Sequence, residues 1–397
     1  MGQIWIEELL KGVVRFFLQP IVYYAILIAI FTGYLRVKRE RKDFHVRLFS
    51  IFQELKFLFP LGLLAGLILS IVSVVTGYTI AYPFIVAVTI VTILFSLIGQ
   101  FRYLSPAFTM GTALILLFLL RIVPISSLSN IVQAVSYHMY TGFAILLGLF
   151  MIVEGWLMRQ NGAKQLSPKL RKSRRGFTVG AFQAKRIWLV PVLCLLPLGP
   201  LTSFVDWWPV ISWGGHSFSF VLVPFLLGFQ QQIQSTLPQQ AIDRVSKQVC
   251  LVGILTIIIA AAGYWYPIFS IVAAFVAILL RGFISLGHRM RENAAPYYFT
   301  PQKKGLMVLA VIPGSPADKM GLEKGEIIQK CNGKMVRHKD EFYQALQINP
   351  AFCKLEVLDI HNEIRFAQGA LFVGDHHELG LLTLDEKPDW DSEKHYS

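Results

Sequence analysis

Very few ionisable side chains lie within the apolar stretches of this chain. Glu154 and His138 sit near the two ends of one apolar run, and Arg121 and Asp206 flank two others. Ionisable groups inside membrane-spanning segments commonly mark ion paths or proton relays. All four lie close enough to the end of a run for their side chains to reach a polar interface. The sequence therefore predicts interfacial positions for them and no transport path.

Motifs for hydrolytic chemistry are incomplete. His377-Glu378-Leu379-Gly380-Leu381 begins like a zinc-protease helix, but the second histidine, needed one turn later, is missing. The sequence has no GxSxG nucleophile motif, no aspartate pair within its apolar runs and no glycine-rich phosphate loop. We therefore expect a chain that is not an enzyme and that needs no metal and no cofactor.

The four cysteines are Cys194, Cys250, Cys331 and Cys353. None belongs to a CxxC motif, and no histidines lie at metal-ligand spacing from them. The pattern predicts reduced, buried thiols in a chain that faces the cytosol.

Charge and hydropathy divide the chain into two parts. Of its 397 residues 54% are hydrophobic and 15% are charged, whereas soluble domains carry about 25% charged residues. Residues 1–295 hold 9 acids and 25 bases, and residues 296–397 hold 15 acids and 12 bases. The bases of the first part lie in short segments between apolar runs, which is typical of membrane proteins and argues against nucleic-acid binding.

Apolar runs of the length of a spanning helix recur through the first part. They lie at about 16–35, 55–75, 80–98, 106–123, 136–157, 187–205, 217–234, 248–265 and 267–286. Alternate connections are basic, beginning with Arg36–Arg47, which has six bases and two acids. The sequence thus predicts an α-helical polytopic membrane domain with eight or nine transmembrane helices in residues 1–292. The nine-span form places the N-terminus outside and the C-terminal part inside.

Two features of this part have alternative interpretations. Arg159–Arg186 has nine bases and no acid, among them Lys169, Arg171, Lys172, Arg174 and Arg175. These side chains either bind anionic lipid headgroups or only fix the orientation of the chain. Gly62, Gly66 and Ser70 form a stripe of small residues that favours close packing, either within the molecule or between two copies.

Beyond residue 292 the pattern is that of a small α+β domain. We expect strands at 306–312, 325–330, 334–336, 352–359 and 364–368, with Ser315 capping a short helix. An amphipathic helix at 338–347 places Phe342 and Leu346 on one face. A strand edge beside a helix can receive an extended peptide. The acidic residues 383–397 are expected to be a disordered tail.

These motifs resemble bacterial PDZ domains, here assigned to residues 293–382. The similarity rests on Gly305-Leu306-Met307-Val308, Pro313-Gly314-Ser315-Pro316-Ala317, Gly325-Glu326-Ile327-Ile328 and Asn332-Gly333. The resemblance implies a cytoplasmic peptide-binding groove formed by Gly305, Leu306, Met307 and Val308 together with Phe342 and Leu346. Lys304 would attract a carboxylate or an acidic ligand.

As a whole, the chain resembles the MinJ-like family of Gram-positive division-site membrane proteins, through its architecture, its length and its opening run around Glu7–Pro20. That resemblance implies an adaptor at the septum and poles of a bacterial plasma membrane. Its partners would be a DivIVA-like curvature-sensing protein and a MinD-like division inhibitor. The alternative is a regulatory subunit that presents peptides to a membrane protease or secretion system. The oligomeric state does not follow from the sequence.

Overall fold

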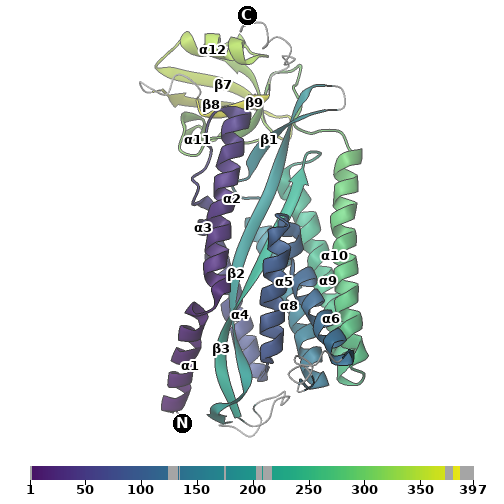
Figure 1. Cartoon of the computed structure of the whole chain (residues 1–397). Coiled ribbons are helices and arrows are strands. Elements are labelled where there is room, and N and C mark those ends of the chain that lie inside the picture. Colours follow the sequence, from purple (N-terminus) through teal and green to yellow (C-terminus); the bar gives the residue numbers. More distant parts are fainter. Residues whose placement is uncertain are drawn as a thin grey trace, which may run out of the picture.

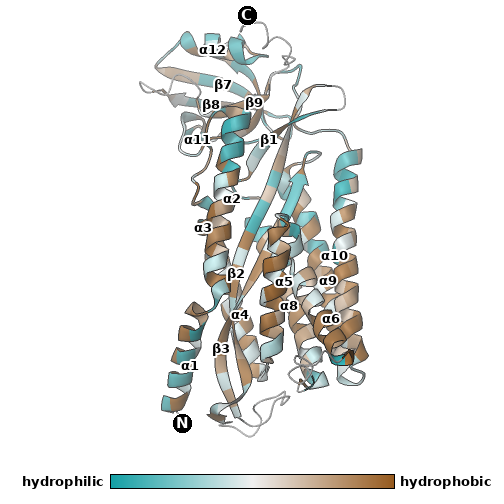
Figure 2. Cartoon of the chain, viewed as in Figure 1, coloured by the Kyte–Doolittle hydropathy of each residue, from teal (hydrophilic) through white to brown (hydrophobic). Residues whose placement is uncertain are grey.

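The computed structural model describes residues 2–123, 133, 135–173, 176–202, 208, 217–371 and 379–384. They form an elongated body (residues 2–294) with a small C-terminal module (residues 306–384) at one end, and the N-terminus lies at the other end (Figure 1). The body is mostly hydrophobic, and hydrophilic residues gather toward the module (Figure 2).

The body contains most of the helices. They are α1 (Gly2–Phe17), α2 (Pro20–Phe44), α3 (Gln53–Leu58), α4 (Pro60–Thr76), α5 (Tyr82–Leu97), η1 (Phe101–Leu104), α6 (Pro106–Ile122), α8 (Tyr137–Asn161), α9 (Pro238–Ala261), η2 (Ala262–Tyr264) and α10 (Ile268–Ala294). Among the described residues, five helical stretches are long and apolar enough to cross a membrane: Pro20–Phe44, Gln53–Thr76, Tyr137–Asn161, Pro238–Tyr264 and Ile268–Ala294. The helices α5 and α6 are apolar but shorter.

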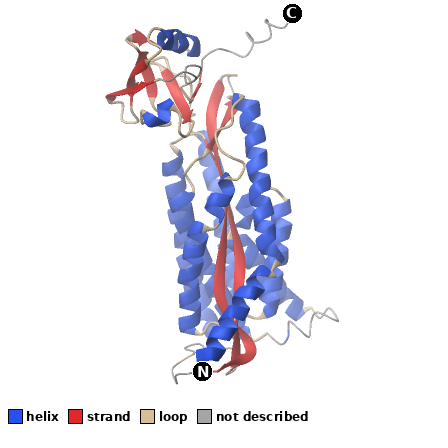
Figure 3. Ribbon diagram, turned by 90° about the vertical axis from the view of Figure 1, so that its left-hand side faces the viewer, coloured by secondary structure: helices blue, strands red, loops and turns tan. Residues whose placement is uncertain are grey.

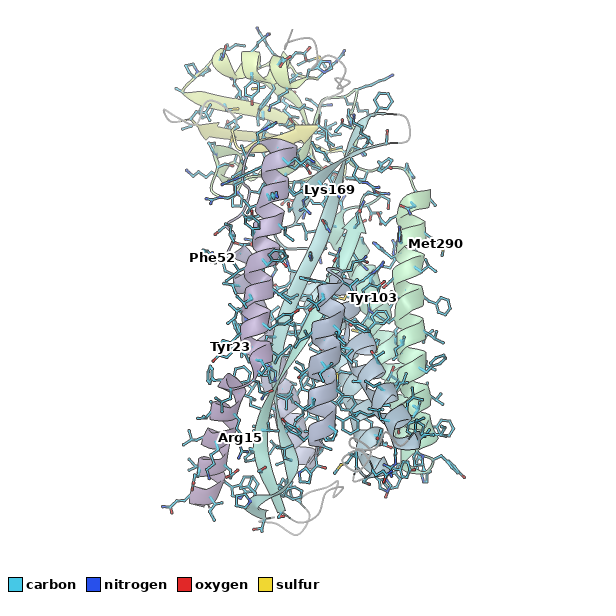
Figure 4. All side chains as sticks on the ribbon, viewed as in Figure 1. Arg15, Tyr23, Phe52, Tyr103, Lys169 and Met290 are labelled. Atoms are coloured by element: carbon cyan, nitrogen blue, oxygen red, sulfur yellow. The ribbon has the colours of Figure 1, made fainter. Side chains whose placement is uncertain are left out.

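The outer surface of the body is unusually apolar for a surface. Phe52 and Met290, labelled in Figure 4, lie on opposite sides of the body and are 57% and 59% exposed. Many leucine, isoleucine and phenylalanine side chains of α4, α5, α9 and α10 are similarly exposed. Contiguous exposed apolar surface of this extent marks a region that contacts lipid or protein.

Two of the predicted spans are not helices. Residues 187–205 and 217–234 fall largely within β2 (Thr178–Thr202) and β3 (Ser217–Ile233), which form a long antiparallel hairpin. Figure 3 shows this hairpin running along the body among the helices. Prolines explain the difference, because three of them (191, 197 and 200) fall within one run and would each break a helix interior. The prediction of eight or nine transmembrane helices was therefore wrong for this pair.

The hairpin is hydrophobic throughout because both of its faces are covered. Trp188 and Val190 pack with the cluster formed by α5, α6, α8, α9 and α10. Ile187 and Leu189, which alternate with them, pack on the opposite side with residues of α1, α2 and α3. A strand that is buried on both faces loses the polar alternation of a surface strand, so periodicity alone does not separate it from a buried helix.

The two outer edges of the hairpin are satisfied by neighbouring helices. A Cβ atom on Gly62 or Gly66 would lie 2.2 Å from the carbonyl oxygen of Leu189 or Pro191, so α4 lies directly against the backbone of β2. The Ser70 hydroxyl accepts the Leu193 N–H at 2.8 Å. On the β3 side, Arg15 and Gln19 donate to the carbonyls of Phe220 and Leu222. Backbone groups at membrane depth need such partners, because lipid offers none.

Glu154 is buried inside the body, whereas the sequence predicted an interfacial position. Its Oε1 accepts a bond of 2.8 Å from Arg281 Nη2, and its Oε2 accepts one of 2.6 Å from the Ser105 hydroxyl. Both charged residues are at most 2% exposed. The pair joins α8 to α10 and to the start of α6. The side chain thus satisfies its charge internally, and the interfacial prediction was wrong.

The module is built mainly from strands. They are β4 (Leu306–Val311), β5 (Ile327–Cys331), β6 (Lys334–Met335), β7 (Phe352–Leu358), β8 (Ile364–Ala370) and β9 (Leu381–Leu384), with the helices α11 (Pro316–Lys319) and α12 (Lys339–Gln347). The strands expected between 306 and 368, the helix at 338–347 and the Ser315 cap, which accepts the Asp318 N–H, are confirmed. The last strand was not predicted, and it crosses the expected domain boundary at 382. Residues 385–397, most of the expected tail, lie outside the described residues.

The cysteines are free thiols, as the sequence predicted. Cys331 and Cys353 are both buried within the core of the module. A hydrogen bond to Cys353 and burial both raise the pKa of Cys331, so its reactive thiolate form is suppressed.

Candidate protein-binding edge

The strand order of the module decides where another chain could add to its sheet. The strands run in the order β8-β7-β5-β4-β9, with β6 beside β5. β4 pairs with β5 through Leu306↔Ile328 and with β9 through Met307↔Leu384. Only a strand at the edge of a sheet has unpaired backbone groups to offer.

β4 is paired on both sides within the described sheet, so its backbone offers no open edge there. Gly305, Leu306, Met307 and Val308, which were predicted for the groove, lie at the start of this strand. Val308 uses both of its backbone groups on Glu326 and Gly325. Gly305 lies so close to β5 that a Cβ atom would be 2.3 Å from the Ile328 carbonyl oxygen. These residues build the interior of the sheet. A direct role for any of them in holding a ligand stays a prediction that the structure does not test.

Among the described residues, β9 is an edge strand with β4 as its sole partner. Ile312 N–H donates to the Gly380 carbonyl, so Gly380 points toward β4. Because backbone groups alternate along a strand, those of Leu381 and Thr383 point toward the open edge. This short segment is one of two sheet edges at which an extended chain can pair with the module, and β8, which pairs only with β7 among the described residues, forms the other.

Gly380 positions the start of β9. Its φ of 76° lies in the left-handed region, and a Cβ atom there would lie 2.1 Å from Ser315 Cβ. Only glycine combines that conformation with that close approach. In the sequence, this stretch was interpreted only as an incomplete zinc motif. A glycine that opens a short apolar run, Leu381-Leu382-Thr383-Leu384, is the pattern that indicates a strand here.

The helix α12 packs into the core of the module. Phe342 and Leu346 are 3% and 4% exposed and belong to the apolar cluster that also contains Leu379 and Leu381. The two helical residues predicted for the groove are therefore core residues in this structure. Lys304 is exposed in the turn before β4, near the Leu384 end of β9, because Leu384 pairs with Met307.

The module packs on the body through the outer face of β4 and β9. Leu309 and Leu384 share a cluster with Phe182 and Phe299, and Gly180 N–H donates to the Phe299 carbonyl at 2.9 Å. Burial in this junction lowers the pKa of Lys324, whose ammonium lies 5.6 Å from the centroid of the Phe182 ring. The body therefore fixes the orientation of the candidate edge.

The predicted basic loop is largely a strand. Lys169, Arg171 and Lys172 lie on β1 (Ser167–Lys172), which pairs with the start of β2. Arg171 donates to Gln234 at 2.8 Å, and Figure 4 places Lys169 in the part of the body near the module. Arg174 and Arg175 lie outside the described residues. Lipid contact by the three placed residues stays a prediction.

The described residues contain no group of three or more histidine, cysteine, aspartate or glutamate side chains that could hold a metal ion. What their arrangement offers is a backbone edge on a module that is held rigidly at one end of an apolar body. That arrangement suits recognition of an extended protein segment.

Comparison with known proteins agrees with this architecture. A family model described as a PDZ domain matches residues 307–358. The chain is 37% identical over 387 residues to the cell division topological determinant MinJ of Bacillus subtilis, covering 97% of both chains. It is 26% identical over 360 residues to the probable cell division topological determinant MinJ of Lacticaseibacillus paracasei, covering 89% of this chain and 92% of that relative. With a PDZ domain at the end of an apolar body and similarity along its whole length, the chain belongs to the MinJ family.

Proposed function

We propose that this protein is a membrane-anchored, non-enzymatic adaptor that helps to select the division site. The proposal is supported chiefly by a PDZ module that packs on a body with lipid-compatible helices and whose strand β9 pairs on one side only, with β4, among the described residues. The names of its relatives supply the process, because they are described as cell division topological determinants.

The proposed partners follow from the family resemblance. A DivIVA-like protein would recruit the adaptor to curved membrane at septa and poles, and a MinD-like protein would be held there together with the division inhibitor. The edge of β9 can pair with one extended segment of a partner. The loops of the body that lie at the same end as the module would offer further surface for binding. The basic residues of β1 would add attraction to anionic lipids.

The proposed topology places the module in the cytoplasm. The order in which the helices and the hairpin traverse the body keeps the basic segments Arg36–Arg47 and 289–294 at the end that carries the module (Figure 1). A strand runs from one end of the body to the other just as a helix does. Replacing two expected helices by β2 and β3 therefore leaves unchanged which connections lie at which end. The N-terminus would then lie outside.

The test combines a fluorescent fusion with a change in β9. In dividing cells that lack the chromosomal copy, the full-length fusion should form a septal band and restore normal cell length. Thr383→Pro removes a backbone N–H from the open edge, where proline is tolerated. It should weaken capture of the edge-binding partner by roughly three- to tenfold. Thr383→Val keeps the N–H and serves as the matched control.

Two results would count against distinct parts of the proposal. Uniform membrane fluorescence of the unmodified fusion, with normal division in the deletion strain, would remove the division-site function. Equal partner capture by the Thr383→Pro and Thr383→Val proteins would remove β9 as the binding edge and leave the function intact. Co-purification with protease subunits and without division proteins would favour the protease-regulator alternative.

A further inference from the structure

A cavity of about 210 Å³ lies between α2 and β2. Its wall carries Arg36 and Arg39 from α2 and Lys185 and Arg186 from β2, with Glu54 from α3 as the acid among the lining residues. Arg36 and Arg186 are 8% and 3% exposed. Four cations around one small space are costly to bury unless anions compensate them.

The carboxylates nearby compensate only part of this charge. Glu54 accepts from Arg186 Nη1 at 3.1 Å and also binds Arg36. Glu40 lies outside the wall, 3.4 Å from Arg36 Nε, and accepts the Leu48 N–H. Both carboxylates are therefore engaged already, Glu54 by Arg36 and Arg186, and Glu40 by Arg36 and a backbone N–H.

The direct contacts of the other two cations are with neutral groups, although Glu40 and Asp43 lie near Arg39 and Glu54 lies near Lys185. Arg39 donates to Gln183 and, at 2.9 Å, to the Ser167 hydroxyl, while Lys185 lies 3.9 Å from the centroid of the Phe101 ring. Among the described residues, no ion pair joins either cation to a carboxylate. The Nε atoms of Arg39 and Arg186 are buried without a hydrogen-bond partner. The cavity wall itself thus carries four cations and one carboxylate, Glu54, and two of its guanidinium Nε–H groups have no acceptor.

The position of the cavity matches the headgroup level of a bilayer. Leu35 belongs to its wall, and Phe31 and Leu35 on α2 are 60% and 43% exposed on the apolar surface. On the side of the module, α2 continues into the basic stretch that ends at Phe44. An anion in this cavity would thus have lipid chains on one side and water on the other.

We propose that this cavity binds a phosphate-bearing anion, with the phosphate group contacted by Arg39 and Lys185 and supported by Arg186. Guanidinium groups match phosphate oxygens in geometry and number of donors, and a lysine ammonium adds a point charge. An anionic phospholipid of the module-side leaflet and free inorganic phosphate share this chemistry. The site is separate from the PDZ edge and does not depend on the proposed division role.

The test uses the detergent-solubilised full chain and follows its thermal unfolding during titration with short-chain lipids. Dihexanoyl phosphatidylglycerol should raise the unfolding temperature more than dihexanoyl phosphatidylcholine, whose choline offsets the phosphate charge. The pair Arg39→Gln and Lys185→Gln should weaken this binding on the order of tenfold. The pair Arg39→Lys and Lys185→Arg keeps both charges and should restore it.

The matched control removes two charges elsewhere on the same helix. Arg41 and Lys42 are exposed and lie outside the cavity wall, so the pair Arg41→Gln and Lys42→Gln should bind phosphatidylglycerol like the unmodified chain. If the glutamine pair at 39 and 185 fails to fold, Lys185→Gln alone replaces it, because the Lys185 ammonium makes a ring contact with Phe101 and its known hydrogen bonding is through the backbone.

The outcomes separate the two sources of phosphate. A shift with phosphatidylglycerol that depends on residues 39 and 185 supports a lipid headgroup site. The same dependence with inorganic phosphate in place of the lipid supports a free-phosphate site. The proposal is overturned if neither ligand raises the unfolding temperature of the unmodified chain, or if phosphatidylcholine raises it as much as phosphatidylglycerol. It is also overturned if the variant changed at residues 41 and 42 loses as much binding as the variant changed at residues 39 and 185.

Discussion

At the scale of single residues, the most informative side chains are the buried charges of the body. Glu154 and Arg281 satisfy each other across two helices, and Ser105 completes the set of partners. A buried pair adds little net stability compared with apolar packing, but removing one partner leaves an uncompensated charge. The pair therefore fixes which faces of α8 and α10 meet.

Removing the acid alone should destabilise the protein strongly. For Glu154→Gln we expect a loss of about 3–5 kcal/mol, measured as a lower unfolding temperature of the full chain in detergent. The double change Glu154→Met and Arg281→Met should recover much of it. Lys330→Gln breaks the partly exposed Lys330–Glu356 pair, which spans 2.7 Å, and should cost at most about 1 kcal/mol. Equal losses for the two single variants would contradict a buried, paired Glu154.

At the scale of elements, the central hairpin organises the body. Its two faces divide the helices into two groups, with α1 to α3 on one side and the bundle of α5, α6, α8, α9 and α10 on the other. Parts of its edges are covered by the glycines of α4, by Arg15 of α1 and by Gln19, which precedes α2. The stripe of small residues thus serves close packing within the molecule, one of the two predicted alternatives, and the partner is a strand.

The contact between α4 and β2 predicts opposite effects for two glycines. Gly66→Ala should destabilise the chain by roughly 1–3 kcal/mol, because the new Cβ would lie 2.2 Å from the Pro191 carbonyl. Gly287→Ala in α10 meets open space and should be neutral or stabilising by up to about 1 kcal/mol. Unfolding temperatures of the two proteins in detergent give the comparison. A Gly66→Ala protein as stable as Gly287→Ala would be incompatible with a strand at this face of α4.

At the scale of the whole molecule, the direction in which each helix or strand runs along the body determines which connections lie at the same end as the PDZ module. Thr79 pairs with Leu195 near the far end of the hairpin, whereas Gly180 at its near end contacts Phe299 below the module. The connection after α4 and the start of β2 therefore lie at opposite ends of the body.

Labelling from outside the cell should report this arrangement. We expect Thr76→Cys, at the half-buried end of α4, to react with a membrane-impermeant maleimide in intact cells, and Lys172→Cys, at an exposed position, to react only after permeabilisation. Both positions are compared with the chain that carries only its native cysteines, three of which are fully buried. Labelling of Lys172→Cys in intact cells would place β1, and with it the PDZ module, outside.

The sequence by itself determined the features that are local or summed over many residues. Turn residues and short-range periodicity located most strands of the module, and composition separated it from the apolar body. These two predictions succeed because each depends on neighbours in the chain or on average composition. The distribution of bases predicted which connections share one side of a membrane, and that topology stays a prediction.

Tertiary structure alone decided the features that depend on partners distant in sequence. Residues 187–202 are a strand because β3 and two groups of helices cover them, and hydropathy is the same for a buried strand and a buried helix. Glu154 is buried because Arg281, 127 residues away, meets it. Strand β4 lies inside the sheet, and β9 and β8 form its two edges, because the assembled strand order places them so. Which backbone groups remain unpaired is a property of the assembled sheet, so no single stretch of the sequence contains it.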